Sequence, residues 1–224
     1  MPSYFGPGPL WARMGRACPT VGMSVINPSN GPGAAREPRY AAQVKNSQSA
    51  GLTVLGYVHT AYGARPAGAV RADVDAYCLW YGVDGVFFDE ASTERSYASS
   101  YYAALYDHVQ AHNGKALTIL NPGTQTDESY MAVADVVVTF EGSYGAYVGA
   151  NPVPSWVGDY PPRRFWHLVY AAQGVRKMQK AVRLSEKRGA GWVYVTPYDL
   201  PNPWASLPPE PYWSRELSAV GAAP

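Results

Sequence analysis

The sequence predicts an α/β protein, a single TIM-type (β/α)8 barrel in which residues 1–224 form one domain. Three observations predict this fold. Short runs of apolar and β-branched residues alternate with stretches of helical length, and the runs are apolar on both faces, as in strands that helices cover. Their ends recur about every 28 residues, the length of a compact strand–helix unit. A chain of 224 residues is also long enough for one such barrel.

Seven strands are expected from these apolar runs, and Pro2–Phe5 is expected to add the eighth. The seven runs are Thr20–Ile26, Leu52–Val58, Val83–Phe88, Ala116–Leu120, Asp135–Phe140, Phe165–Tyr170 and Trp192–Thr196. Helices are expected between them, over Tyr40–Ala50, Ala67–Tyr81, Ser96–Asn113 and Val175–Arg188. A Pro- and Trp-rich tail after residue 196 adds a last helix near Trp213–Val220 and closes the barrel. An open, doubly wound sheet is the alternative, but no G-x-G-x-x-G pattern follows a strand.

Composition excludes several classes of protein. Lys and Arg number 18 against 17 Asp and Glu, and this net charge of +1 argues against a nucleic-acid partner, which requires a basic face. No apolar run reaches the length of about 18 residues that a membrane span needs, and the first residues lack the pattern of a signal peptide. Cys18 and Cys78 are interpreted as small buried side chains, with a single disulfide bridge as the alternative.

Acidic residues follow two of the expected strands. Asp89 and Glu90 come directly after Val83–Phe88, and Glu141 follows Asp135–Phe140. Because the active site of a (β/α) barrel lies at the carboxyl ends of its strands, these are candidate catalytic residues. Successive strand residues face opposite sides, so Asp89 and Glu90 cannot both point into the mouth of an extended strand end. Helix capping is the alternative role for Asp89, whereas Glu is a poor N-cap.

Two carboxylates on strands two positions apart fit glycoside hydrolysis. Neighbouring strands lie about 4.8 Å apart, and inward-leaning side chains would bring the carboxyl groups to about 5–6 Å from each other. This separation is typical of the retaining mechanism, in which one acid attacks the anomeric carbon and the other transfers a proton. Burial and mutual repulsion are expected to raise the pKa of the proton donor.

Other chemistries have less support in the sequence. No G-x-S-x-G motif of a serine hydrolase is present. His108 and His112 lie one helical turn apart on an expected outer helix, but the sequence shows no third ligand, so we expect no metal site. No pattern indicates a cofactor, and none is expected.

Several short motifs run in order along the chain. They are Ile26-Asn27-Pro28 with Gly31-Pro32-Gly33, Gly56-Tyr57-Val58-x-Thr60-x-Tyr62-Gly63-x-Arg65, Trp80-Tyr81-x-Val83-Asp84-Gly85-Val86-Phe87-Phe88-Asp89-Glu90, Asn121-Pro122-Gly123, Phe140-Glu141-Gly142, Gly189-Ala190-Gly191-Trp192-Val193-Tyr194-Val195-Thr196 and Asn202-Pro203-Trp204. Together they cover essentially the whole chain, and their combination resembles the spherulin-4 family.

The resemblance implies a (β/α)-barrel glycoside hydrolase. Characterised relatives cleave α-1,4-linked galactosamine or N-acetylgalactosamine stretches of galactosaminogalactan, a secreted fungal biofilm exopolysaccharide, and endo-α-1,4-polygalactosaminidases are related to them. The resemblance makes Asp89 the nucleophile, Glu141 the acid/base and Glu90 a supporting residue of a retaining, endo-acting enzyme. The reverse assignment of Asp89 and Glu141 stays open. A secreted or cell-surface location is implied too, although the chain starts inside the presumed first strand without the usual signal or anchor.

Further polar and aromatic residues near the expected strand ends are expected to line the sugar cleft, where Tyr rings stack on sugars and polar groups bond to hydroxyls. They are Tyr4, Asn27, Tyr57, His59, Asn121, Tyr170 and Asp199. Turn geometry and packing are the alternative roles, above all for Asn27 and Asn121, and a structural role is equally open for His59. Tyr144, Tyr147 and Trp156 lie in a Gly- and Pro-rich loop, interpreted as a lid or a subsite wall.

The expected partner is a polysaccharide rich in amino sugars. An acidic mouth on a near-neutral protein suits a polymer that carries free ammonium groups. The chain is expected to act as a monomer. Two other functions stay open: a non-catalytic carbohydrate-binding or coat protein on the same barrel, and a glycosidase for a different glycan.

Overall fold

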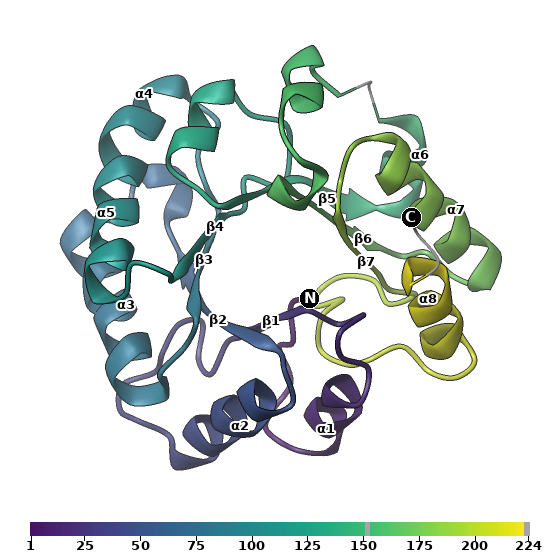
Figure 1. Ribbon diagram of the computed structural model, residues 1–224, viewed down its shortest axis with the longest axis horizontal. Helices are drawn as coiled ribbons and strands as arrows, with labels where there is room; N and C mark the ends of the chain where they lie inside the picture. The colour runs from purple at the N-terminus through teal and green to yellow at the C-terminus, as the bar shows by residue number, and fades with distance from the viewer. Residues whose placement is uncertain (151–152, 222–224) are drawn as a thin grey trace.

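Seven parallel strands form one curved sheet in the computed structural model, which describes residues 1–150 and 153–221 (Figure 1). The strands are β1 (Met23–Ile26), β2 (Thr53–His59), β3 (Gly85–Asp89), β4 (Leu117–Leu120), β5 (Val136–Ser143), β6 (Phe165–Tyr170) and β7 (Trp192–Val195). Their order in the sheet is their order in the chain, and every pairing is parallel. This sequential order excludes the doubly wound alternative, in which the strand order reverses.

The sheet curves around a shared apolar interior. Phe87 of β3 and Trp166 of β6 stand three strands apart, yet their ring centroids lie 5.8 Å from each other, edge to face. Both side chains are buried. Helices cover the outer side of the same strands, which explains why the runs are apolar on both faces (Figure 1). The prediction of seven buried strands from these runs is confirmed.

The predicted eighth strand at Pro2–Phe5 is wrong as a strand. Pro2 forms an isolated parallel bridge with Val25, and it has no N–H with which to extend a ladder. β1 and β7 are therefore the two edges of the sheet, and the start of the chain lies in the gap between them (Figure 1). The Tyr4 N–H donates to the carbonyl of Trp204 at 3.1 Å, so the C-terminal tail reaches this gap too. The fold is thus a helix-covered parallel α/β sheet, without the expected eight-stranded ladder.

Helices form the outer layer of the molecule (Figure 1). They are α1 (Pro9–Gly15), α2 (Pro38–Ser49), α3 (Ala67–Tyr81), α4 (Arg95–Tyr97), α5 (Ala103–His112), α6 (Tyr144–Gly149), α7 (Val175–Lys187) and α8 (Tyr212–Gly221), with 3-10 segments at Ala61–Gly63, Glu128–Ala132, Ser155–Asp159 and Pro162–Arg164. The expected helix Ser96–Asn113 is interrupted by a π-helical turn, Ala98–Tyr102, between α4 and α5. The sequence does not predict α1 and α6, because helices of seven and six residues are too short to show an apolar period.

The loop after Glu141 contributes to the core as well as to the surface. Tyr147 of α6 is fully buried, where its hydroxyl bonds to Nδ1 of His167 at 2.7 Å and the Arg188 guanidinium lies 4.6 Å from its ring centroid. Tyr147 is therefore a packing residue, which corrects its expected place in a lid or subsite wall. Residues 151–152 of this loop lie outside the described residues.

Cys18 and Cys78 are free thiols of intermediate exposure, so both the expected burial and the alternative bridge are wrong. None of the helices described in the structure combines the length and the hydropathy needed to cross a membrane.

We expect Gly56→Ala to destabilise the fold by about 1–3 kcal/mol, measured by chemical denaturation. A Cβ on this β2 residue would lie 2.5 Å from Cγ of the Tyr77 ring, and Tyr77 of α3 is fully buried, so it cannot move aside. Gly68→Ala is the matched control, because nothing lies within 4 Å of a Cβ added there. It should leave stability unchanged or raise it by up to about 1 kcal/mol. Equal losses in the two variants would contradict this packing argument.

Candidate active site

The carboxyl end of β3 carries two acids that face different partners. Asp89 is the last residue of β3, opposite His59 of β2 in the register, and its side chain accepts a hydrogen bond from Asn121. Glu90 has a φ of +51°, in the left-handed region that non-glycine residues rarely adopt, so the chain turns there. Its carboxylate lies 3.8 Å from Nδ1 of His59, and its side chain is 42% exposed. Asp89 therefore faces the neighbouring strand end, while Glu90 lies on the more exposed side of the turn.

Thr60 holds this turn in place. Its hydroxyl lies 3.1 Å from the carbonyl oxygen of Asp89, 2.8 Å from that of Glu90 and 3.0 Å from the Tyr102 hydroxyl. Thr60 is fully buried, so these hydrogen bonds form away from water, where they are strongest. The hydrogen bonds to the carbonyl groups of Asp89 and Glu90 hold the backbone of Glu90 in its left-handed conformation.

The turn after β4 connects the end of β3 to β5. The Asn121 N–H donates to the Phe88 carbonyl at 2.8 Å, and the Asn121 carbonyl accepts from the Ala91 N–H at 2.9 Å. The N–H of Gly123 donates to Oδ1 of Asn121 at 3.0 Å, while the Gly123 carbonyl accepts from the Glu141 N–H at 2.8 Å. Gly123 has a φ of +67°, which suits glycine, and these bonds align Glu141 beside Asn121.

Asn121 brings the two candidate catalytic acids together. Its Nδ2 donates to Oδ1 of Asp89 at 2.7 Å and to Oε2 of Glu141 at 2.6 Å. The two acceptor oxygens are therefore no more than about 5.3 Å apart, within reach of one sugar ring and close to the separation of retaining glycosidases. Asn121 itself is only 4% exposed. Because both hydrogens of Nδ2 are engaged, this nitrogen positions the acids, and the expected bond to a sugar hydroxyl falls to Oδ1, which has a second lone pair.

Aromatic residues complete the surroundings of the pair. The indole N–H of Trp204 donates to Oε1 of Glu141 at 3.3 Å. Tyr57 of β2 is almost fully buried and its side chain hydrogen-bonds to Asp89, and the Tyr4 ring packs edge to face on Tyr57 at 5.4 Å. Each carboxylate thus has a partner besides Asn121, and the pair is walled by apolar ring surface.

The two acids differ in how their environments act on protonation. Burial is the main cause that raises the pKa of Glu141 to about 7, the negative charge of Asp89 adds to it, and hydrogen bonds from Asn121 and Trp204 oppose it. Burial also raises the pKa of Asp89, but hydrogen bonds from Tyr57, the Glu90 backbone and Asn121 counteract that rise. Near neutral pH a proton shared by the pair therefore belongs on Glu141 rather than on Asp89.

The remaining expected cleft residues divide into two groups. His59 lies at the end of β2 and contacts Glu90, the neighbour of Asp89. Tyr170 lies at the end of β6, and its ring centroid is 6.4 Å from that of Trp204, which bonds to Glu141. Both residues therefore lie near the pair. Asn27 and Asp199 do not join them through any described contact. The side chain of Asn27 accepts from the Gly31 N–H at 3.0 Å, the alternative turn role, and exposed Asp199 accepts from the N–H of Leu200.

The sequence analysis missed Thr60 and Trp204 as site residues. Both stand in the quoted motifs, but neither is an acid at a strand end. Trp204 follows the last strand by nine residues, and only the folded tail shows that its indole reaches Glu141.

Comparison of sequences gives a family for the chain. Residues 1–220 match the profile of the spherulation-specific family 4, Spherulin4. Spherulin-4 of Physarum polycephalum is 37% identical over 171 residues, which are 71% of this chain and 51% of that protein. The chain thus spans about half the length of this curated relative.

Comparison of structures finds a protein solved with a bound amino sugar and a chitinase. Sph3 of Aspergillus clavatus, solved in complex with GalNAc, has a TM-score of 0.83 at 22% identity and is matched over 98% of this chain and 95% of its own. A chitinase from Rhizomucor miehei has a TM-score of 0.57 at 11% identity over 97% of this chain and 99% of its own. At these identities the likeness shows a shared fold.

We expect Asp89→Asn to lower the pKa of Glu141 below about 7, because the substitution removes the negative charge beside it. Burial is unchanged, so the pKa should stay above the ordinary value of about 4.3. Carbon-13 NMR titration of labelled Glu carboxyl groups measures the shift. Asp107→Asn is the control, since Asp107 is an exposed residue of α5. An unchanged pKa for Glu141 in Asp89→Asn would show that the two acids do not interact.

Proposed function

The chain belongs to the spherulation-specific family 4, and we propose that it is a glycoside hydrolase that cleaves amino-sugar polysaccharides with Asp89 and Glu141. The observation that carries the proposal is the Asn121 amide, which bonds to both carboxylates at once. Two acids held this close, one with a raised pKa, are the parts that glycosidic bond cleavage requires. The glycoside hydrolases that share the fold support the same reaction.

The proposed reaction is a double displacement. Protonated Glu141 gives its proton to the glycosidic oxygen while the Asp89 carboxylate attacks the anomeric carbon, so the carbon–oxygen bond to the departing chain breaks. Glu141, now a carboxylate, takes a proton from water, and that water attacks the anomeric carbon and releases Asp89. Asn121 holds the two acids in register through both steps, and each step inverts the anomeric carbon, so the product keeps the original configuration.

The proposed substrate is an exopolysaccharide with α-1,4-linked galactosamine or N-acetylgalactosamine, cleaved internally. The GalNAc held by Sph3 supports an amino sugar in this fold. The carboxylates of Asp89 and Glu90 also attract free ammonium groups, which a partly deacetylated polymer carries. Tyr4 and Tyr170, which are partly exposed, supply ring surface for the sugar faces. We further propose a single catalytic domain that acts as a secreted or surface-exposed monomer.

We expect Asp89→Asn and Glu141→Gln each to lower kcat on such a polymer by at least about 10²-fold, because each removes one of the two reacting carboxyl groups. Release of reducing ends is measured on a panel of galactosamine, N-acetylgalactosamine and glucosamine polymers. Glu90→Gln should lower kcat less, since the Glu90 side chain is 42% exposed and only its backbone, which the substitution keeps, bonds to Asp89.

The same panel tests the alternatives. Binding without release from any polymer would favour a non-catalytic carbohydrate-binding protein. Release from the glucosamine polymer alone would favour a glycosidase for a different glycan. Full activity in Asp89→Asn would contradict the proposed mechanism.

A further inference from the structure

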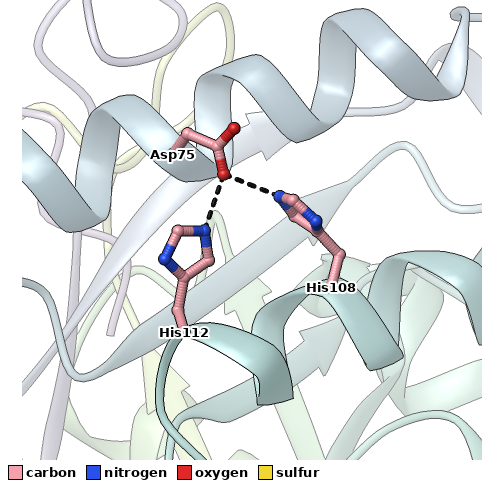
Figure 2. Close-up of side chains that lie close together, drawn as sticks. All are labelled: Asp75, His108 and His112. Carbon is pink, nitrogen blue, oxygen red and sulfur yellow. Dashed lines mark hydrogen bonds and ion pairs between the residues drawn. The ribbon is translucent and has the colours of Figure 1, made fainter.

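A cluster of three possible metal ligands lies on the outer helices. Nε2 of His108 is 2.7 Å from Oδ1 of Asp75, and Nε2 of His112 is 2.6 Å from the same oxygen (Figure 2). The two imidazole rings stand nearly perpendicular, with centroids 5.2 Å apart. Both rings therefore converge on a single carboxylate oxygen. Neither the helix propensity of histidine nor the solvation of a surface side chain requires two rings to meet at one oxygen.

Two helices supply the three side chains. Asp75 is in the middle of α3, and His108 and His112 lie one turn apart near the end of α5, on the face that turns toward α3 (Figure 2). The sequence shows only the histidine pair, because the third ligand comes from a helix more than thirty residues earlier in the chain. The structure thus supplies the ligand whose absence led to the expectation of no metal site.

The geometry suits a small transition-metal ion. The three ligand atoms lie within 4.8 Å of one another. In a tetrahedral zinc site with bonds of about 2.0–2.1 Å, ligand atoms are about 3.3 Å apart, so the nitrogens of His108 and His112 would move about 0.6 and about 0.7 Å farther from the Asp75 oxygen. The side chains are 52%, 26% and 33% exposed for Asp75, His108 and His112, so they can make this adjustment and an ion can reach them without unfolding.

The choice of ligands narrows the class of ion. Two imidazole nitrogens and one carboxylate oxygen are typical ligands of Zn²⁺ and its neighbours in the transition series, whereas Mg²⁺ and Ca²⁺ prefer oxygen. Three protein ligands leave the fourth position to water. Cys78 lies one turn after Asp75 on α3, but it is not among the three atoms that converge.

We propose that Asp75, His108 and His112 bind one Zn²⁺-class ion that links α3 to α5. The site is separate from Asp89 and Glu141, which lie at the ends of strands in the sheet interior, and it does not depend on the proposed function. Because the ion binds only where both helices are folded, it stabilises the folded state.

The test uses the full chain without an affinity tag, dialysed against a chelator and then titrated with Zn²⁺ or Co²⁺. We expect one saturable site by calorimetry, visible absorption bands of tetrahedral Co²⁺, and a rise in Tm on adding Zn²⁺. Asp75→Asn, His108→Gln and His112→Gln should each weaken binding by at least about tenfold, the lower limit for loss of even an indirect partner of a metal site. Asp107→Asn and Cys78→Ser, on the same two helices, should bind as the wild type does.

Three results would overturn the proposal. The first is the absence of saturable binding by the wild-type chain. The second is equal binding by the wild type and Asp75→Asn. The third is a loss of stability in Asp75→Asn, relative to the wild type, that is equal with and without Zn²⁺. The cluster would then only join the two helices by hydrogen bonds. None of these measurements depends on sugar release, so failure of the metal proposal and failure of the proposed function can be told apart.

Discussion

The hydrogen bonds from one amide nitrogen of Asn121 to Asp89 and Glu141 are the constraint on which the rest of the site depends. Two carboxylates this close repel each other when both are ionised, so the amide and a raised pKa on one of them are needed to hold the pair. Glu141 is the acid with the strongly raised pKa, since burial and the charge of Asp89 bring it to about 7. The same closeness gives the two carboxyl groups different affinities for a proton.

The fold supplies this closeness through a parallel sheet in chain order. β3, β4 and β5 are consecutive neighbours, so Asp89, Asn121 and Glu141 come from three adjacent strand ends although they span more than fifty residues of sequence. Backbone bonds around Gly123 tie β4 to β5, and Thr60 fixes the turn after β3. Placement of the acids is thus a property of the sheet and its turns, with the side chains adding the final bonds.

The sequence predicts those parts of the molecule that depend on local patterns. Buried strands show as apolar runs, and Asp89 and Glu141 stand out because charge is rare at the ends of such runs. The prediction of a strand at Pro2–Phe5 is wrong because it follows apolar composition alone and ignores that Pro2 lacks the N–H needed to extend a ladder, so that only one isolated bridge forms. Trp204 and Asp75 could not be found locally, since each acts on a partner brought near only by the fold. Asn121 was selected, but its position between two acids becomes visible only in three dimensions.

The most direct test of the account is to trap the covalent intermediate with a slow 5-fluoro galactosaminyl fluoride and to locate the label by mass spectrometry of peptides. We predict a mass increase of one glycosyl unit on the peptide that contains Asp89, because its carboxylate forms the bond to the anomeric carbon. The label should be absent from Asp89→Asn. A label on Glu141 or Glu90 would contradict the account.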